Sequence, residues 1–442
     1  MQDDDLSKAR HRAVPSGRLA RLGGFGRPAG GAAGGMLAEG ARRLAAGERP
    51  KVGDLILTPG NAARVADRLS HLRGAAMKLG QMISMDAGDV LPPELQTILA
   101  QLRNQAYRMP PQQLDRVLRE EWGADWRRRF RHFEASPVAA ASIGQVHRAT
   151  LPDGRLLAIK VQYPGVADSI GADVDNVATL LRVSGLLPAT LDLKPLLEEA
   201  KRQLAEEADY VREGAELRAY RERLAGDARY VVPALEEALT TKRVLAMEFV
   251  AGRPIEALEE ASQDARDAAM TSLITLVLRE LFEFGVMQTD PNFANYRWQP
   301  ETGALVLLDF GAARRVPAET AAGYRRLIEA GLARDHDAIR ETAVAVGFLG
   351  AAAAAAHRPA IDRIIAAIDE ALNRPGPFDF GDRAFVPVVR EEAKAMIADR
   401  TTWHVPHVET LFVQRKVSGT ALLAARLKAR VDVRGLAAAA VG

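Results

Sequence analysis

The fold is decided by Gln288-Thr289-Asp290-Pro291-Asn292-Phe293-Ala294-Asn295, followed by Leu307-Leu308-Asp309-Phe310-Gly311. An Asp, an Asn five positions later and a D-F-G beyond them are typical of the metal-and-base half of a kinase-type phosphoryl-transfer site. Asp290 is expected beside the γ-phosphate, as catalytic base or to orient an attacking group. Asn295 and Asp309 supply hard oxygen ligands, which suit Mg²⁺ bridging the phosphates of a nucleotide. The stretch therefore predicts a site for ATP and Mg²⁺.

The segment between the two motifs predicts a hairpin. Tyr296 to Leu308 has the pattern strand, turn, strand, with the turn at Pro300 to Gly303. Such a hairpin returns the two sets of oxygen ligands to the same place. The alternative is a polar loop before an apolar strand that happens to end in Asp. A D-F-G alone is weak evidence, but the ordered pair of motifs is much stronger.

A second half of the site is predicted around Lys160. Ala158-Ile159-Lys160 lies in an apolar run, Leu156 to Gln162, and matches the strand that carries the phosphate-binding lysine of kinases. A hairpin turn at Asp153-Gly154 is predicted before this strand. A lysine inside such a strand is costly to bury unless it is paired. ATP phosphates and a helix glutamate would pair it, and the alternative is an edge-strand lysine that faces solvent. Several glutamates crowd what is predicted to be one helix, and helical geometry does not choose between Glu206 and Glu213.

The loop expected to cover the phosphates departs from the ordinary pattern. Kinases place G-x-G-x-x-G here, so that the backbone can fold tightly over the phosphates. This chain has Ala139-Ala140-Ala141-Ser142-Ile143-Gly144, with one glycine. Alanine resists positive φ, so we expect a stiffer loop whose amides point differently. The hydroxyl of Ser142 would lie near phosphate or metal.

Composition restricts the function classes. The chain has 442 residues, enough for two or three domains, and a formal net charge of +2, which does not call for a nucleic-acid partner. It has no cysteine, which excludes disulfides, thiolate metal sites and a cysteine nucleophile, and suits a reducing cytoplasm. No run of 18 apolar residues is present, so no transmembrane segment is predicted.

The order of these patterns predicts an α+β, bilobal protein-kinase-like fold with an N-terminal helical extension. The nucleotide would lie between the two lobes, with Met247 to Gly252 as the hinge and with Glu248 and Val250 in contact with it. The Gly/Arg-rich start of the chain is either a disordered arm or an arm that binds a membrane or a partner. The predicted parts are a flexible arm at 1–55, a helical extension at 56–135, an N-lobe at 136–252 and a helical C-lobe at 253–442. Within the extension, a helical pattern covers roughly 111 to 132, opened by Pro110-Pro111.

Together these residues resemble the UbiB family of atypical kinase-like proteins, which is linked to ubiquinone biosynthesis. Four further stretches resemble its K-x-G-Q motif, alanine-rich loop, E-x-D motif and catalytic loop: Lys78-Leu79-Gly80-Gln81, Ala139–Ser142 continued by Ile143–His147, Glu207-Ala208-Asp209, and Gln288–Asn292. The resemblance covers about residues 60 to 430 in order.

The resemblance implies roles for individual residues. It assigns Lys160 to the α- and β-phosphates and Glu213 to the ion pair with Lys160, with Asp290, Asn295 and Asp309 in the active centre. It also implies that the helix of Lys78 and Gln81 lies across the cleft, with Lys78 directed at Glu207 and Asp209. Some members carry C-terminal membrane spans, but in this chain charged residues interrupt Leu422 to Gly442, which leaves peripheral contact with membrane or lipid open.

The sequence therefore predicts an ATP- and Mg²⁺-dependent atypical kinase or ATPase that supports ubiquinone biosynthesis and meets proteins of that pathway. A conventional protein kinase is disfavoured, because only five residues separate Gly311 from Pro317 and no A-P-E follows. Thr289 also replaces the arginine through which activation-loop phosphates usually act. Two alternatives stay open: an ATP-sensing scaffold that assembles biosynthetic partners, and a small-molecule kinase of the antibiotic- or choline-kinase type.

Overall fold

The computed structural model describes residues 109–141, 143–183, 194–399, 402 and 407–442. The predictions for the arm, for Lys78 and Gln81, and for Ser142 lie outside these residues. The chain divides into two compact units. The first holds the described residues up to Gly214 together with Leu235–Phe249, and the second holds Ala215–Ala234 and Val250–Gly442. The expected lobe boundary after residue 252 lies close to Phe249, whereas residues 215–234 belong to the second unit.

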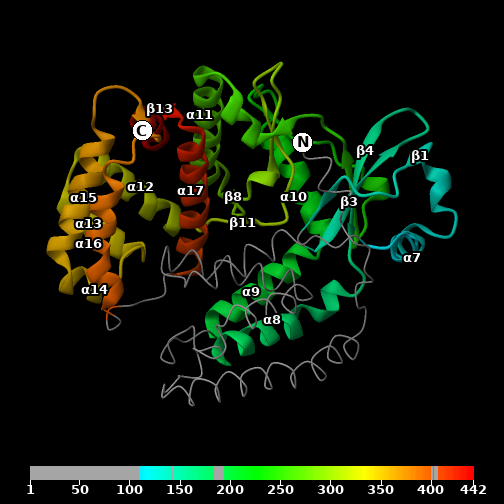
Figure 1. Ribbon diagram of the computed structural model, residues 1–442, viewed down its shortest axis with the longest axis horizontal. Coiled ribbons are helices and arrows are strands. Elements are labelled where there is room, and N and C mark those ends of the chain that lie inside the picture. The colour runs from blue at the N-terminus through cyan, green and yellow to red at the C-terminus, as the bar shows by residue number, and fades with distance from the viewer. Residues whose placement is uncertain (1–108, 142, 184–193, 400–401, 403–406) are drawn as a thin grey trace, which may run out of the picture. The chain divides into compact units, whose positions relative to one another are not determined.

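A small antiparallel sheet organises the first unit (Figure 1). Its order is β1-β3-β4-β6, with β2 on β3; the bounds are β1 His132–Phe133, β2 Ala139–Ala140, β3 Gly144–Thr150, β4 Leu156–Gln162 and β6 Val244–Glu248. Strand β4 has the predicted bounds. The β3–β4 hairpin turns at Asp153-Gly154, where Gly154 has φ 91° and Asp153 Oδ1 accepts from the Arg155 N–H at 2.9 Å. This is the turn that the D-G pair predicts.

The core of the first unit is aromatic at one end of the sheet. Trp122, Trp126 and Phe130 pack with the buried side chains of β4. Helix α7 (Pro111–Trp122) is shorter than the predicted 111–132, because Gly123 takes φ 88° and the chain continues as a 3-10 turn, η3 (Trp126–Arg129). Left-handed backbone of this kind ends a helix and suits glycine.

The glutamate-rich region is three helices, α8 (Val166–Val183), α9 (Lys194–Glu207) and α10 (Tyr210–Arg223). The prediction that Glu206 and Glu213 share one helix is wrong, since the first ends α9 and the second lies in the first turn of α10. Asp209 explains the break, because its Oδ1 accepts from the N–H groups of Val211 and Arg212, both at 3.1 Å. An Asp that caps a new helix in this way competes with continuation of the old one.

In the second unit, one helix leads into the predicted catalytic loop. Helix α11 (Gln263–Arg279) passes into a π-helical turn, η6 (Glu280–Phe284), and then into β8 (Val286–Gln288). The predicted strand-turn-strand is confirmed: β9 (Tyr296–Trp298) pairs antiparallel with β10 (Leu305–Leu307). The other short elements of this unit are β5 Tyr230–Val231, β7 Arg253–Pro254, η5 Ile255–Glu260, η7 Phe293–Asn295 and β11 Ala313–Arg315.

Helices form the rest of the second unit. Helices α12, α13, α15 and α16 pack in succession, and α17 (red in Figure 1) stands beside β8 and β11. The bounds are α12 Ala318–Ala333, α13 His336–Ala345, α14 Ala351–Ala356, α15 Arg358–Leu372, α16 Val386–Ala398, α17 Val408–Leu427 and α18 Val433–Val441, with a two-stranded sheet of β12 Phe378–Asp379 and β13 Arg430–Val431. Within the described residues, none of the helices combines the length and apolar character needed to span a bilayer.

Candidate active site

Lys160 and Glu213 form a buried ion pair in the first unit. Lys160 Nζ lies 2.8 Å from Glu213 Oε1 and 3.0 Å from Oε2, and the two side chains are 9% and 2% exposed. Strand β4 places the lysine among buried neighbours, so its charge requires a partner there. Glu206 instead lies on α9 with its Oε2 3.9 Å from Arg212 Nη2. The structure thus selects Glu213 from the two candidates that helical geometry left open.

The alanine-rich loop is held as sheet. Ala139 and Ala140 pair with Val146 and Gln145 of β3, and the Ala141 N–H donates to the Gly144 carbonyl at 2.9 Å. Gly144 is needed for close packing, because a Cβ at this position would lie 2.3 Å from the carbonyl oxygen of Val161. The glycine of this loop therefore serves the contact between β3 and β4.

Asp290, Asn295 and Asp309 gather at one place in the second unit. Asn295 Nδ2 donates to the Asp290 carbonyl at 3.3 Å and lies 3.4 Å from Asp290 Oδ2. The Leu308 N–H donates to the Asn295 carbonyl at 3.0 Å, which brings the next residue, Asp309, to the same loop. Asp309 Oδ1 in turn accepts from the Gly311 N–H at 3.0 Å. All three predicted side chains are partly exposed, and each has a carboxylate or amide oxygen of the kind that binds Mg²⁺.

These donors fit a magnesium ion that arrives with a nucleotide. Mg²⁺ is commonly held by one or two carboxylates together with substrate phosphates and water. In the part of the chain that the structure describes, no group of three or more His, Cys, Asp or Glu could hold a metal by itself. Asp309 and Asn295 match the first pattern, in which the nucleotide completes the coordination.

The loop is fixed from both sides. Gln288 at the end of β8 pairs with Ala313 of β11, and both the N–H and the hydroxyl of Thr289 donate to the Ala312 carbonyl, at 3.1 and 2.9 Å. Phe310 of the D-F-G is buried against Tyr220, with 4.7 Å between the ring centroids. The D-F-G is therefore anchored by its aromatic ring, which leaves the Asp309 carboxylate at the surface of the loop.

Sequence reasoning missed a buried network of charged and polar side chains that contacts the catalytic loop at Gln288. Lys416 of α17 and Glu280 of η6 are both fully buried, with Lys416 Nζ 3.5 Å from Glu280 Oε2. Lys416 also donates to Tyr296 at 2.9 Å and to Gln288 Oε1 at 3.4 Å. Burial raises the pKa of Glu280, against the effect of Lys416. Burial is the largest single effect and lowers the pKa of Lys416, but Glu280 and Tyr296 together outweigh it and the pKa is raised.

The residue before Lys416 reaches the predicted catalytic base. Arg415 Nη2 lies 3.1 Å from Asp290 Oδ1, across a separation of 125 residues in the chain. Sequence reasoning missed this contact as well. An Arg-Lys pair on an amphipathic helix resembles a solvated face, and no local pattern could have indicated that both side chains point inward.

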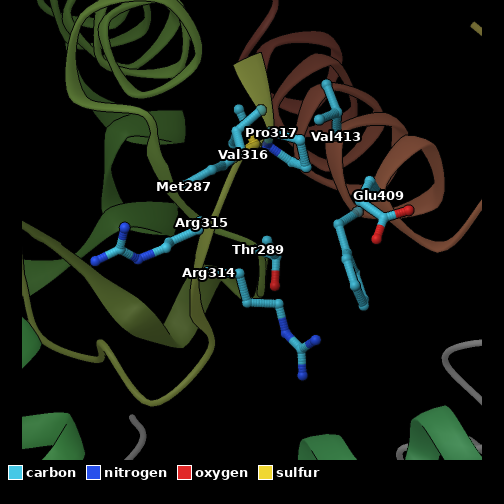
Figure 2. Close-up of a pocket in the computed structure, with 9 residues that line it drawn as sticks. Met287, Thr289, Arg314, Arg315, Val316, Pro317, Glu409 and Val413 are labelled. Carbon is cyan, nitrogen blue, oxygen red and sulfur yellow. The ribbon is translucent and has the colours of Figure 1, made fainter. Parts of the chain in front are cut away.

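A small hollow lies beside the loop, shown in Figure 2. Thr289 forms part of its wall next to Asp290, and α17 contributes Glu409 and Val413. The Arg314 guanidinium carbon lies 4.5 Å from the Phe412 ring centroid. The remaining lining residues are Met287, Arg315, Val316 and Pro317. The segment that follows the D-F-G is therefore packed against α17.

Comparisons with known proteins point to a kinase-like domain. Residues 101–343 match the model of the ABC1 atypical kinase-like domain. The chain is 37% identical over 433 residues to "Atypical kinase COQ8B, mitochondrial" of Danio rerio, covering 97% of this chain and 69% of that protein. It is 34% identical over 432 residues to "Atypical kinase COQ8, mitochondrial" of Saccharomyces cerevisiae, covering 97% and 86%.

A solved structure shows the same fold. The complex of Rv3197 with erythromycin from Mycobacterium tuberculosis matches with a TM-score of 0.59 and 26% identity, covering 85% of this chain and 94% of that one. This likeness confirms the predicted kinase-like fold. The domain model covers more than half of the chain, and the two relatives are matched over most of their own length. The chain therefore belongs to the UbiB family of atypical kinase-like proteins.

Proposed function

We propose that the chain binds ATP together with Mg²⁺ and acts as an atypical kinase or ATPase. The observation that carries the proposal is the gathering of Asp290, Asn295 and Asp309 on one hydrogen-bonded loop of the second unit. This is the ordered set of base and metal ligands that phosphoryl transfer requires. The buried lysine–glutamate pair of the first unit is a second support, because kinases bind nucleotide phosphates with a lysine paired in this way.

Each residue has a defined part in this proposal. Lys160, held by Glu213, binds the α- and β-phosphates as a fixed positive charge. Asp309 and the Asn295 side chain hold Mg²⁺, which when bound would neutralise charge on the phosphates. Asp290 accepts the proton of an acceptor hydroxyl or orients a water molecule.

The acceptor is proposed to be small. Strand β11 pairs with β8 immediately after the D-F-G, and α12 begins at Ala318. The chain therefore has little length in this segment from which to build the platform that docks a peptide. The bound erythromycin named for the Mycobacterium tuberculosis relative favours a small organic ligand, and it keeps a small-molecule kinase as the second candidate.

The biological setting follows from the family. We propose that the activity supports ubiquinone biosynthesis, alongside other proteins of that pathway and with peripheral contact to membrane lipid. The relatives in fish and yeast are named as mitochondrial kinases. For this chain, the absence of cysteine suits a reducing compartment.

Phosphate release from ATP by the purified protein tests the proposal. The assay is run with and without anionic lipid vesicles and phenols that resemble quinone precursors, with Asp290→Asn as the inactive control. Phosphate release without a phosphorylated acceptor supports the ATPase, and a phosphorylated phenol or other small molecule supports the kinase. Tight ATP binding with neither product, in every condition, would instead favour an ATP-sensing scaffold.

A further inference from the structure

Helix α17 touches the catalytic loop at three points along one stretch. The contacts are Arg415 with Asp290, Lys416 with Gln288, and Gly419 with Pro291. Two consecutive side chains of the helix thus reach two alternate residues of the loop, and the third contact is made by backbone. This spacing makes α17 a support for the whole turn between β8 and η7.

Gly419 shows how closely the helix and loop approach. A Cβ at this position would lie 2.2 Å from the Cβ of Pro291 and 2.6 Å from its Cγ. Glycine is a poor residue for a helix interior. Glycine at this position lets the helix and the loop approach closely, and any larger side chain would push them apart.

Arg415 brings a positive charge that the loop itself does not carry. From Val286 to Asn295 the sequence contains no Lys, Arg or His. Arg415 contacts Asp290 Oδ1 at 3.1 Å, whereas Asn295 Nδ2 lies 3.4 Å from Oδ2. The Arg415 side chain is 6% exposed and that of Asp290 is 22% exposed. Each carboxylate oxygen therefore has its own donor, and the arginine is the more buried partner.

We infer that Arg415 is a positioning residue for Asp290, an inference that rests on the function proposed above. In the kinase reaction the acceptor oxygen bonds to the γ-phosphorus, and the bond to the ADP oxygen breaks with its electron pair leaving on ADP. The acceptor proton passes to Asp290. Arg415 takes part in none of these transfers. It fixes Oδ1, so that the carboxylate holds one orientation, and the Asn295 side-chain oxygen would be left to hold Mg²⁺.

Substitution at Arg415 tests the inference in the full-length protein. Arg415→Gln keeps a polar donor but removes the charge, and Arg415→Lys keeps the charge. Arg363→Gln is the matched control, since Arg363 forms an exposed two-point pair with Glu392, at 2.7 Å for both contacts. The readouts are kcat and KM for Mg-ATP, and hydrogen exchange of the backbone over residues 286–298 without ligand.

The expected result is a loss confined to kcat. Arg415→Gln should lower kcat about 10- to 100-fold, since a misplaced catalytic group costs this much even when substrate still binds. KM for ATP should stay within about threefold of wild type, because Arg415 is not assigned to the nucleotide. Arg415→Lys should regain part of kcat, the loop should exchange faster in Arg415→Gln, and Arg363→Gln should match wild type in every readout.

Other outcomes overturn the inference or separate it from the proposed function. Wild-type kcat in Arg415→Gln, or a rise in KM as large as the fall in kcat, would show that Arg415 does not act through Asp290. If the wild-type protein neither releases phosphate nor phosphorylates an acceptor, the proposed function fails. Unchanged loop exchange in Arg415→Gln then overturns the positioning role separately. Gly419→Ala is the second test variant, to be used if Arg415→Gln does not fold. It should displace the loop and lower kcat, and wild-type kcat in it would count against support by α17.

Discussion

Among the residues that the structure describes, two lysine–glutamate pairs are buried, one in each unit, and they are built differently. Lys160 lies within 3.0 Å of both oxygens of Glu213, and its side chain keeps 9% exposure. Lys416 has no exposure and lies between Glu280, Tyr296 and Gln288, each within 3.5 Å. A lysine has three N–H donors, so Lys416 has an acceptor in reach for each of them.

The difference separates a binding charge from a structural one. A lysine paired with a carboxylate at a position that keeps some exposure is suited to an incoming phosphate, which strengthens rather than replaces the pair. Lys416 is sealed from water, donates to Tyr296 and Gln288 and faces the Glu280 carboxylate, an environment that suits a structural charge. The second pair therefore supports the catalytic loop, because Lys416 donates to Gln288 of that loop. The residue before it, Arg415, contacts Asp290 of the same loop.

The largest expected effect is on stability, at Lys416. Lys416→Met leaves Glu280 buried without its cation, and breaking a buried pair in this way costs about 3–5 kcal/mol of unfolding free energy. Denaturant unfolding followed by tryptophan fluorescence measures the loss. Adding Glu280→Gln removes the orphaned charge and should restore a large part of it. If Lys416→Met alone is as stable as the wild type, the Lys416–Glu280 pair is not the structural charge pair described above.

Acid should weaken the first unit through His147 on β3, in the strand beside Lys160. Burial lowers the pKa of His147 from 6.5 to about 4. Between these values the unfolded chain binds a proton that the folded chain refuses, so stability falls as the pH decreases from 6.5 and levels off below about 4. The full difference is about 3 kcal/mol.

Denaturant unfolding across this pH range checks the prediction. His147→Gln keeps a donor for the Glu134 carbonyl, which the ring nitrogen Nδ1 contacts at 2.8 Å. The variant should show a flatter dependence of stability on pH. Equal slopes in the two proteins would mean that other groups cause the loss in acid.

The smallest of the three effects is on nucleotide binding at Lys160. Lys160→Met should weaken Mg-ATP binding about 10- to 100-fold, the value of a hydrogen bond between charged groups. Lys201→Met is the control, because Lys201 pairs with Asp175 and Glu198 on the surface of the same unit. Calorimetric affinities that are the same for both variants and wild type would remove Lys160 from the binding site.

Sequence reasoning succeeded where the chemistry is local. The apolar strand around Lys160 and the turn before it are specified by neighbouring residues, and β4 has the predicted bounds. Asp290, Asn295 and Asp309 come together through a short hairpin whose two strands were also predicted. In each case the residues that decide the structure lie within one hairpin or one strand.

Sequence reasoning failed where the deciding contact is distant or competes with a periodic pattern. The helix after Pro111 ends at Gly123, although apolar spacing continues beyond it. Asp209 begins a new helix because its side chain caps it, which a count of glutamates does not reveal. Arg415 and Lys416 face inward only because a loop 125 residues earlier in the chain packs on α17. Tertiary packing of this kind overrides local preference.

Calorimetric titration of Mg-ATP into Asp309→Asn and Asp290→Asn, with turnover measured on the same samples, tests the central claim most directly. Asp309→Asn exchanges a carboxylate for a neutral amide and should lose Mg²⁺-dependent nucleotide binding. Asp290→Asn should bind Mg-ATP nearly as wild type does and release no phosphate. Wild-type affinity in Asp309→Asn, or an equal loss of binding in both variants, would contradict the division of metal and base between these two residues.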